Sequence, residues 1–442
     1  MILLDVDAIN IITQLEKNGF EAYIVGGSVR DNILGLPVHD WDICTSATPD
    51  QIQLIFPNTI ATGLKHGTIT VINQNKVFEL TTFRNDGIYS DKRRPDTVQF
   101  STFLSDDLSR RDFTMNAIAA DKMGNLIDPF EGVNDISNKT IKTVGNPHKR
   151  FSEDALRILR ALRFASVLGF TIENNTAIAI LEQRHMLQYI SKERIFSELK
   201  ACLTGKHVGE ILLTYKEVFA EIIPELKPTF DFNQNNRHHI FDVYVHIVKT
   251  VENIQPDVEL RLCMLLHDIA KPFCESKDNT GESHFYGHPQ KSEELARIIL
   301  TRLKCDRNTM KTVLQLIHEH DRNIPPTKSD IKKFLSLYNI DFFLKLLSVK
   351  KADIAAQAPR YAKENLAYLD NLFTLCKQIL SNDECFMLKQ LAINGSDLIQ
   401  QGFYGKEIGT ALSLLLQMVI EEKIKNNRQE LLDFIKKNKK TP

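Results

Sequence analysis

This chain lacks the features that mark secreted, membrane-spanning or disulfide-framed proteins. Its seven cysteines are an odd number, and no two are spaced as Cys-x-x-Cys. This argues against a disulfide framework or a zinc knuckle and favours reduced thiols. The longest apolar stretch, near residues 412–420, is far too short for a membrane span, and residues 1–5 lack the basic region of a secretory signal. We therefore expect a cytoplasmic protein with no membrane partner.

The chain also lacks a strong net charge, which is −1 over 442 residues. Bulk charge therefore does not indicate nucleic-acid binding, and the local distribution matters more. Residues 139–200 contain eleven Lys and Arg against six Asp and Glu, which fits a phosphate-binding face and a solvated surface equally well. A chain of this length exceeds one ordinary core and predicts about three domains.

Two neighbouring features stand out against this ordinary background. An apolar run at 22–25 leads into Gly26-Gly27, where backbone N–H groups can approach a phosphate at the start of a helix. Asp40 and Asp42 follow at i, i+2 spacing, which places both side chains on one face of a strand. Adjacent carboxylates repel unless a cation lies between them, and Mg²⁺ with substrate phosphates is the expected occupant. The segment predicts a nucleotidyl transfer site with Asp40 and Asp42 as catalytic metal ligands.

Further segments follow in chain order at 62–68, 79–84, 110–117, 128–132 and 153–164. Together with residues 26–45, they resemble the signature of the class II tRNA nucleotidyltransferases and bacterial poly(A) polymerases. The resemblance implies template-independent addition of CCA, or of its terminal A, to the 3′ end of tRNA from CTP and ATP. In this two-metal reaction the tRNA 3′-hydroxyl attacks the α-phosphate and pyrophosphate leaves.

The resemblance also implies the fold class: an α+β nucleotidyltransferase head, with a small mixed sheet and helices, followed by an all-α neck, body and tail. We expect the head at 1–138, a neck with the nucleotide-selecting helix at 139–225, a helical HD domain at 226–358 and a tRNA-binding helical tail at 359–442. Within the head, the pattern predicts strands at 21–25, 40–45, 67–73 and 76–83.

Arginine and carboxylate side chains are expected to hold the nucleotide. Guanidinium groups suit a triphosphate, and the resemblance implies ribose recognition around Asp112 and Asn116. Glu79 shares a strand face with Val77 and Thr81, where a third acid near the aspartate pair and an exposed strand residue are equally good interpretations. The expected nucleotide-binding set is Gly26, Gly27, Ser28, Arg30, Arg110, Arg111, Asp112, Asn116, Glu153, Asp154, Arg157, Arg160 and Arg163.

A helix capped by Ser152 is predicted to carry nucleotide selection. Asp154 and Arg157 lie at i, i+3 and Glu153 and Arg157 at i, i+4, spacings that usually give salt bridges on a helix. Arginine also donates to base acceptors, and aspartate accepts from the exocyclic amine of cytosine or adenine. The resemblance implies that these residues form a template that selects CTP and then ATP. The chain departs from the family pattern at Ala155, where proline is usual.

Residues 85–94 are charged, contain a glycine and have few core residues, which predicts a mobile loop. The resemblance links this loop to addition of the final A, and its acidic and basic residues are present here. We therefore expect an enzyme that is not restricted to adding CC.

A second candidate site lies in a histidine-rich region. His267-Asp268 follow an apolar run at 260–266, with His246 upstream and Asp353 downstream. The four resemble the ligand pattern of HD phosphohydrolases, which implies a bound transition metal. Residues that would extend this set are His288, His318 and His320.

The sequence is also compatible with two alternatives to CCA addition. A bacterial poly(A) polymerase shares the head signature, although it usually carries a strongly basic C-terminal extension. An HD metal-dependent phosphohydrolase would use its head as a nucleotide-binding module, although intact Asp40 and Asp42 argue against a head that only binds.

Overall fold

The computed structural model describes residues 2–38, 40–64, 67–73, 76–86 and 98–438. The chain divides into two compact units. The first takes in Met1–Pro224 and the second runs from Glu225 to Pro442, apart from Arg302–Lys304, which cluster with the first. Each unit is described by itself.

The first unit begins with a mixed sheet whose strand order is β3-β4-β5-β2-β1-β8-β9. Only β2 and β5 pair in parallel; the other neighbouring strands are antiparallel. The strands are β1 (Ala22–Val25), β2 (Asp42–Thr45), β3 (Thr59–Gly63), β4 (Thr68–Asn73), β5 (Lys76–Thr82), β8 (Ala119–Ala120) and β9 (Leu126–Ile127). A separate hairpin pairs β6 (Arg84–Asp86) with β7 (Val98–Phe100).

Short helices surround this sheet, and local capping explains where several begin. Asp5 accepts hydrogen bonds from the first backbone N–H groups of α1 (Val6–Lys17), and Thr48 with Gln51 caps α3 (Pro49–Ile55). The remaining helices of the head are α2 (Gly27–Ile33), α4 (Leu104–Ser109), the 3₁₀ turn η2 (Thr114–Asn116) and α5 (Gly132–Ser137). Buried Ile24, Ile43 and Leu80 form the centre of the sheet.

The neck completes the first unit. Its helices are α6 (Pro147–Glu153), α7 (Leu156–Leu168), α8 (Asn174–Gln183), η3 (Arg184–Tyr189), α9 (Lys192–Leu203), α10 (Val208–Thr214) and α11 (Lys216–Ile222). A short parallel pair joins β10 (Thr140–Ile141) to β11 (Thr171–Ile172). Helix α7 packs against α9, and Leu159 and Leu162 of α7 and Leu199 of α9 are buried.

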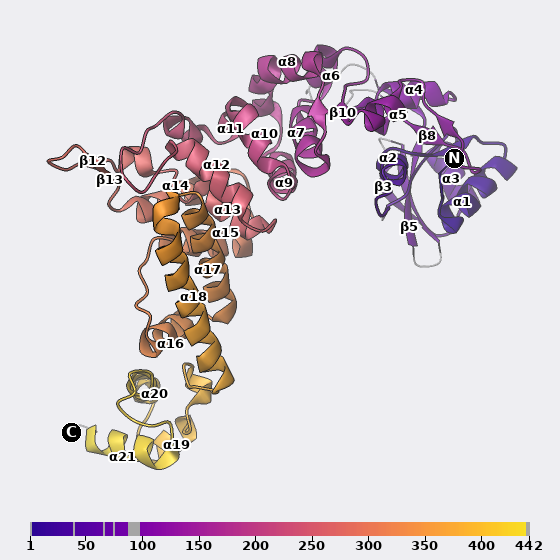
Figure 1. Cartoon of the computed structure of the whole chain (residues 1–442). Helices are drawn as coiled ribbons and strands as arrows, with labels where there is room; N and C mark the ends of the chain where they lie inside the picture. Colours follow the sequence, from indigo (N-terminus) through magenta and orange to yellow (C-terminus); the bar gives the residue numbers. More distant parts are fainter. Residues whose placement is uncertain (1, 39, 65–66, 74–75, 87–97, 439–442) are drawn as a thin grey trace. The chain divides into compact units, whose positions relative to one another are not determined.

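The second unit is helical apart from the small hairpin of β12 (Ser276–Lys277) and β13 (Ser283–His284). Helices α17 and α18 pack along each other (Figure 1). The elements are η4 (Pro224–Thr229), α12 (Val243–Asn253), α13 (Val258–Leu266), η5 (Lys271–Phe273), α14 (His288–Arg302), α15 (Arg307–Glu319), α16 (Lys328–Leu337), α17 (Ile340–Ala355), α18 (Pro359–Ser381), η6 (Leu388–Gln390), α19 (Gly395–Gln400), α20 (Lys406–Ile420) and α21 (Arg428–Asn438). The last helices have their own core around Leu398, Leu415 and Leu431.

This architecture confirms the predicted fold class of an α+β head followed by a helical remainder. The two-residue pairs β10–β11 and β12–β13 are additions that the sequence pattern did not predict. Within the described part of the chain, no helix is both long and apolar enough to cross a membrane.

Candidate active site

The sheet brings two acidic side chains together. Asp42 opens β2, and its register partner in the parallel neighbour β5 is Glu79. Adjacent residues in register lie on the same face of a sheet. Asp42 and Glu79 both line one cavity, and the charge of Glu79 acts on Asp42. Glu79 is thus close to Asp42, but its side chain is also exposed, so its role as a third acid stays a prediction.

Asp40 differs from the prediction. The strand begins at Asp42, so Asp40 lies before it and is exposed rather than on a strand face. The pairing stops because β1 ends at Val25, the partner of Asp42, and Gly26 turns away with a φ of 76°. An added Cβ at Gly26 would lie 3.0 Å from Arg111 Nη1, so this turn favours glycine on two counts. Asp40 still acts electrostatically on Asp42.

The charge on Asp42 is costly in the absence of a cation. Burial, with repulsion from Glu79 and Asp40, raises the pKa of Asp42 to about 6, although the positive charge of Arg111 opposes the shift. A divalent cation would offset both the repulsion and the lost hydration of this carboxylate. The donor set, with carboxylates beside arginines that suit phosphates, fits Mg²⁺ held by acids and substrate phosphates.

A buried carboxylate that the sequence analysis missed orders the arginines of the site. Asp107 accepts from Arg111 Nη2 at 2.8 Å and from Arg110 Nε at 3.1 Å. Burial raises the pKa of Asp107, but the two arginines hold it below its ordinary value. The three residues lie at i, i+3 and i+4, a spacing that would have revealed the cluster.

Asp112 connects the head with the neck. It accepts from Asn116 Nδ2 at 3.0 Å and from Arg160 Nε at 2.7 Å, and Asn116 accepts from Arg30 Nη1 at 2.7 Å. Although burial raises its pKa, Arg160, Asn116 and Arg157 together hold the pKa of Asp112 well below its usual range. The carboxylate is therefore charged, and its orientation is fixed by partners from two parts of the unit.

The selecting helix is in fact two helices. Helix α6 ends at Glu153, Asp154 has extended backbone, and α7 begins at Leu156. The predicted single helix from Ser152 is therefore wrong, since Asp154 leaves the helical path and its carboxylate accepts from the N–H of Leu156 instead.

The break separates the partners of Asp154 and Arg157. Asp154 pairs with Arg194 of α9 at 2.7 Å, a residue that the sequence analysis missed because it is 40 positions away. Arg157 donates to Glu153 at 2.7 Å and to the carbonyls of Arg150 and Arg110, each at 3.0 Å. Only the Glu153–Arg157 pair forms as the spacing predicted.

A cavity of about 570 Å³ collects most of the predicted residues. It is also lined by Phe164, whose ring lies 4.1 Å from the Arg163 guanidinium and 4.9 Å from that of Arg30. Ser28 is buried and donates to the carbonyl of Val25, so its hydroxyl supports the turn instead of lining the cavity. The predicted residues that line it are Gly26, Gly27, Arg30, Asp42, Glu79, Arg110, Arg111, Asp112, Asn116, Asp154, Arg157, Arg160 and Arg163.

The departure at Ala155 yields a stability prediction. Ala155 has a φ of −64° and follows the extended Asp154, so both backbones accept proline. We expect Ala155→Pro to raise the free energy of unfolding of the first unit by about 0.4–1 kcal/mol, because it restricts the unfolded chain. Denaturant titration measures the change. Ala161→Pro, inside α7, is the contrasting variant and should destabilise by about 3 kcal/mol. A loss of stability in Ala155→Pro would show that the ring does not fit this buried position.

The predicted loop at 85–94 falls largely on residues 87–97, which lie outside the described residues. Its proposed link to addition of the final A stays a prediction.

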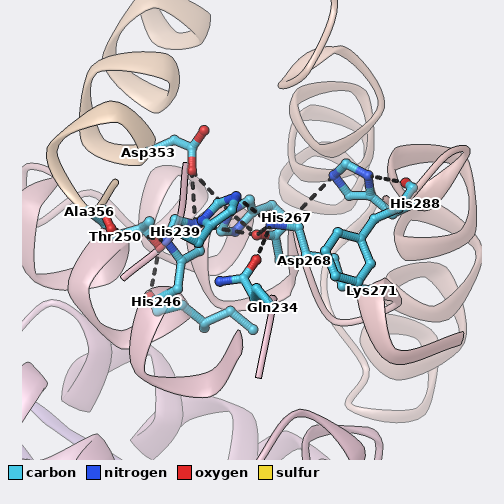
Figure 2. Close-up of polar contacts among 12 residues, drawn as sticks. Gln234, His239, His246, Thr250, His267, Asp268, Lys271, His288, Asp353 and Ala356 are labelled. Carbon is cyan, nitrogen blue, oxygen red and sulfur yellow. Dashed lines mark hydrogen bonds and ion pairs between the residues drawn. The ribbon is translucent and has the colours of Figure 1, made fainter. Parts of the chain in front are cut away.

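The second unit contains a buried histidine cluster (Figure 2). His246 lies on α12, His267 and Asp268 directly follow α13, and Asp353 lies on α17. The distance from His246 Nε2 to Asp353 Oδ1 is 2.9 Å, and from His267 Nε2 to Asp268 Oδ2 it is 3.2 Å. The four residues predicted as an HD ligand set therefore meet in space.

Two of the three added histidines join this cluster. His288 Nε2 and His320 Nε2 lie 3.3 Å and 3.7 Å from Asp268 Oδ1. His318 does not join, since it is exposed on the other side of its helix end and pairs with Glu293 at 2.9 Å. Burial raises the pKa of Asp268, but His267 and Lys271 hold it well below its usual range, so the central carboxylate is charged.

Three family models match the chain. They are the poly A polymerase head domain over residues 22–142, the probable RNA and SrmB-binding site of polymerase A over 169–230, and tRNA nucleotidyltransferase domain 2 over 285–435.

The chain is also similar to individual proteins of known name. The CCA-adding enzyme of Geobacillus thermodenitrificans is 51% identical over 205 residues, which cover 46% of this chain and 51% of that enzyme. The chain thus matches about half the length of this relative. The CCA-adding enzyme of Staphylococcus epidermidis is 35% identical over 433 residues, 96% of each chain. The crystal structure of the Bacillus stearothermophilus CCA-adding enzyme in complex with CTP is 28% identical, with a TM-score of 0.71 and 98% coverage of both chains. This chain therefore belongs to the family of CCA-adding enzymes, the class II tRNA nucleotidyltransferases.

Proposed function

We propose that this protein adds CCA to the 3′ end of tRNA from CTP and ATP. The proposal is supported by one cavity that head and neck residues line together. Asp42 and Glu79 line it from the head, and Asp154 and Arg157 line it from the neck. Acids that suit a metal ion and side chains that suit a base edge therefore line one space. A relative that matches nearly the whole chain bears the name CCA-adding enzyme.

Within this cavity the residues divide into those near the triphosphate and those near the base. Arg111, fixed by Asp107, lies beside Asp42 and offers positive charge to phosphates. Asp112 and Asn116 supply an acceptor and an amide for ribose hydroxyls. We assign Mg²⁺ to Asp40 and Asp42; when bound, it would polarise the α-phosphate and favour ionisation of the attacking 3′-hydroxyl. The α-phosphate–oxygen bond to pyrophosphate breaks as the new phosphodiester forms, and the chain contributes mainly positioning and charge.

Base selection is assigned to Asp154 and Arg157. Aspartate accepts from the exocyclic amine that cytosine and adenine share, and uracil lacks that donor. Because Arg194 and Leu156 hold Asp154 while Glu153 and two carbonyls hold Arg157, both side chains are positioned before a nucleotide arrives. Preorganised donors and acceptors cost less to align on binding.

The proposal is tested with three tRNAs that end before CCA, after the first C, or after CC. Each is incubated with CTP alone, ATP alone or both, and the products are resolved at single-nucleotide length. We expect C on the first two substrates and A only on the third. Addition of A to the third tRNA, with no C on the others, would establish an A-adding enzyme instead. Long A tails on any RNA would establish poly(A) polymerase activity.

The histidine cluster supports a second candidate activity. We infer that His246, His267, Asp268 and Asp353 hold a transition metal and that this HD site hydrolyses phosphate esters such as cyclic or terminal phosphates. A cavity of about 330 Å³ opens beside it and is lined by Asp268, Lys271, Arg237 and Asp353 among others. Lysine and arginine suit a phosphate there, and water would attack phosphorus while the ester oxygen leaves with a proton.

The metal part of this inference has its own prediction. His267→Ala should lower transition-metal content, because it removes one of four ligands. It should leave nucleotide incorporation unchanged, because the cavity of the first unit uses other residues. Elemental analysis of the purified protein, alongside tRNA extension, measures both. Equal metal content in the variant would leave the cluster a structural role only.

We assign tRNA contact to the helical tail at 359–442, a role for which its own core provides an independent scaffold. A tRNA substrate and seven cysteines that are all free thiols favour a cytoplasmic location.

A further inference from the structure

An exposed aromatic ring lies at the edge of the cavity that contains Asp42. Phe100, the last residue of β7, is 46% exposed. It pairs in antiparallel register with Arg84 of β6, and directly opposed residues project from the same face of such a pair. Arg84 lines the cavity, so Phe100 lies beside a residue of the cavity wall. The ring is therefore available to a molecule that enters this cavity.

The backbone beneath the ring holds it in place. A Cβ at Gly67 would lie 2.8 Å from Phe100 Cε1, closer than two such carbons approach, so the ring packs directly on this glycine. Gly67 also has a φ of 76°, a conformation that favours glycine. The next residue, Thr68, lines the cavity. The ring is thus supported while part of it stays exposed, and a ligand that stacks on it does not have to order it first.

The direction of the strands shows on which side of Asp42 this ring lies. Strand β1 ends at the register partner of Asp42, so the Gly26 turn lies beyond the start of β2. Strand β5 runs parallel to β2 and leads away from that turn, toward Arg84. All three parts line the cavity. The Gly26 turn is therefore at one end, Asp42 lies between, and Arg84 with the neighbouring Phe100 is at the other end.

The geometry of nucleotidyl transfer assigns a substrate to each end. The attacking and leaving oxygens lie roughly in line at the phosphorus. Backbone N–H groups of the Gly26-Gly27 turn suit phosphates, so pyrophosphate leaves toward that end. The attacking 3′-hydroxyl then comes from the opposite side of the α-phosphate at Asp42. That side carries Arg84 and Phe100, which makes it the side of the RNA.

The side chains at this end suit RNA of any sequence. Arg84 offers a positive charge to a phosphate, and the hydroxyl oxygens of Thr68 and Thr81, which lie 3.3 Å apart, suit ribose hydroxyls. An aromatic ring stacks on any base. The acceptor end needs this tolerance, because one site has to take tRNAs that end before CCA, after the first C and after CC.

We propose that the 3′-terminal base of the tRNA stacks on Phe100 while Arg84 contacts the phosphate next to it. This inference rests on the CCA addition proposed above and names the residues that position its second substrate. The choice of base then belongs to the incoming nucleotide at Asp154 and Arg157, and Phe100 acts on the acceptor strand alone.

Photochemical crosslinking tests the stack directly. The full protein is mixed with a tRNA that ends after CC and carries 5-iodocytidine as its last nucleotide. The complex is irradiated with near-ultraviolet light without added nucleotides, because the iodinated base couples to an aromatic ring stacked on it. Mass spectrometry of the digest should place the crosslink on Phe100. A crosslink on Phe103, which is 68% exposed, a crosslink only within the neck, or none at all would overturn the stack.

Kinetics distinguish stacking from support of the fold. Phe100→Leu keeps an apolar side chain over Gly67 but cannot stack. Its kcat/KM for a tRNA ending after CC should fall about tenfold or more, the scale of one lost base stack, while the KM for ATP and the melting temperature stay unchanged. Phe100→Tyr should restore the parent value, and Phe103→Leu is the matched control that should equal the parent. A lower melting temperature with a raised KM for ATP would overturn the proposal in favour of a structural role.

Salt dependence tests the phosphate contact. Arg84→Gln should weaken tRNA binding and reduce the slope of log Kd against log salt concentration by about 0.7, the value for one phosphate of single-stranded nucleic acid. Phe100→Leu should weaken binding with an unchanged slope, because a stacked ring neutralises no charge. An unchanged slope in Arg84→Gln would contradict the contact between Arg84 and the phosphate.

The parent protein separates this inference from the proposed function. A parent that extends none of the three tRNAs would refute CCA addition itself. A parent that extends them normally, and a Phe100→Leu variant that equals it, would overturn the stack and leave CCA addition standing.

Discussion

Replacing Asp42 with asparagine should abolish nucleotide incorporation while the protein stays folded. The carboxylate lies beside Glu79 in the sheet register and next to Arg111 in the cavity. Its loss removes the acid that we assign to the metal and the α-phosphate. We expect a fall of at least about 10²–10³-fold, the scale on which single electrostatic stabilisers act in transition states. Single-turnover extension of a tRNA ending in CC, at saturating ATP and Mg²⁺, measures it.

The melting temperature of the Asp42→Asn variant shows whether the protein stays folded when this charge is removed. An uncompensated Asp42 repels Asp40 and Glu79, so Asp42→Asn should keep or raise the melting temperature. Asp50→Asn is the matched variant, because Asp50 is an exposed acid in the first turn of α3, and it should extend tRNA normally. Near-normal extension by Asp42→Asn at saturating Mg²⁺ would refute the assignment of this site.

The second large effect concerns nucleotide choice. Asp154→Asn keeps the acceptor for the Leu156 N–H but adds a donor, which pairs with O4 of uracil better than a carboxylate does. We expect UTP to gain on CTP by a factor of ten or more, since an unpaired buried hydrogen-bonding group costs about 1–3 kcal/mol. Arg157→Ala should also alter the preference among CTP, ATP and the wrong nucleotides. Competition assays with all four nucleotides give the ratios.

Two further variants distinguish selection from mere support of the helices. Arg194→Ala removes the partner of Asp154 and should weaken selectivity less than Asp154→Asn, because the carboxylate remains. Glu193→Gln, an exposed neighbour on α9, should behave as the parent. Equal slowing with all four nucleotides in Asp154→Asn and Arg157→Ala would indicate that these residues are only structural salt bridges.

The sequence predicted the elements that local pattern controls. The strands around Ile24, Ile43 and Ile69 follow alternation or short apolar runs, and the structure contains β1, β2, β4 and β5 at the predicted places. The partner of Asp42 was harder to predict, since the pairing of β2 with β5 depends on sheet order and not on local sequence. Asp40 was placed on a strand face because i, i+2 spacing assumes that the strand continues, whereas its partner strand ends at Val25.

In the neck, too, the pairing of Asp154 was predicted wrongly because local spacing does not show where a helix is interrupted. Spacings of three and four residues place side chains together only in an unbroken helix, and Asp154 interrupts it. Arg194 therefore replaced Arg157 as the partner of Asp154. In the histidine cluster, His318 and His320 look equivalent in sequence, but they leave the end of α15 in different directions and only His320 faces Asp268. Which of the two histidines faces Asp268 depends on how the helices pack and not on the composition of the segment.

We propose that one cavity adds C, C and then A to tRNA and that addition then stops. The most direct test is the mass of the tRNA product after prolonged incubation of a tRNA lacking CCA with all four nucleotides. We expect a product longer by two cytidylates and one adenylate, because we assign selection of CTP and then ATP to Asp154 and Arg157 beside Asp42. A product that is unextended, that carries uridylate or guanylate, or that continues into a run of adenylates would contradict it.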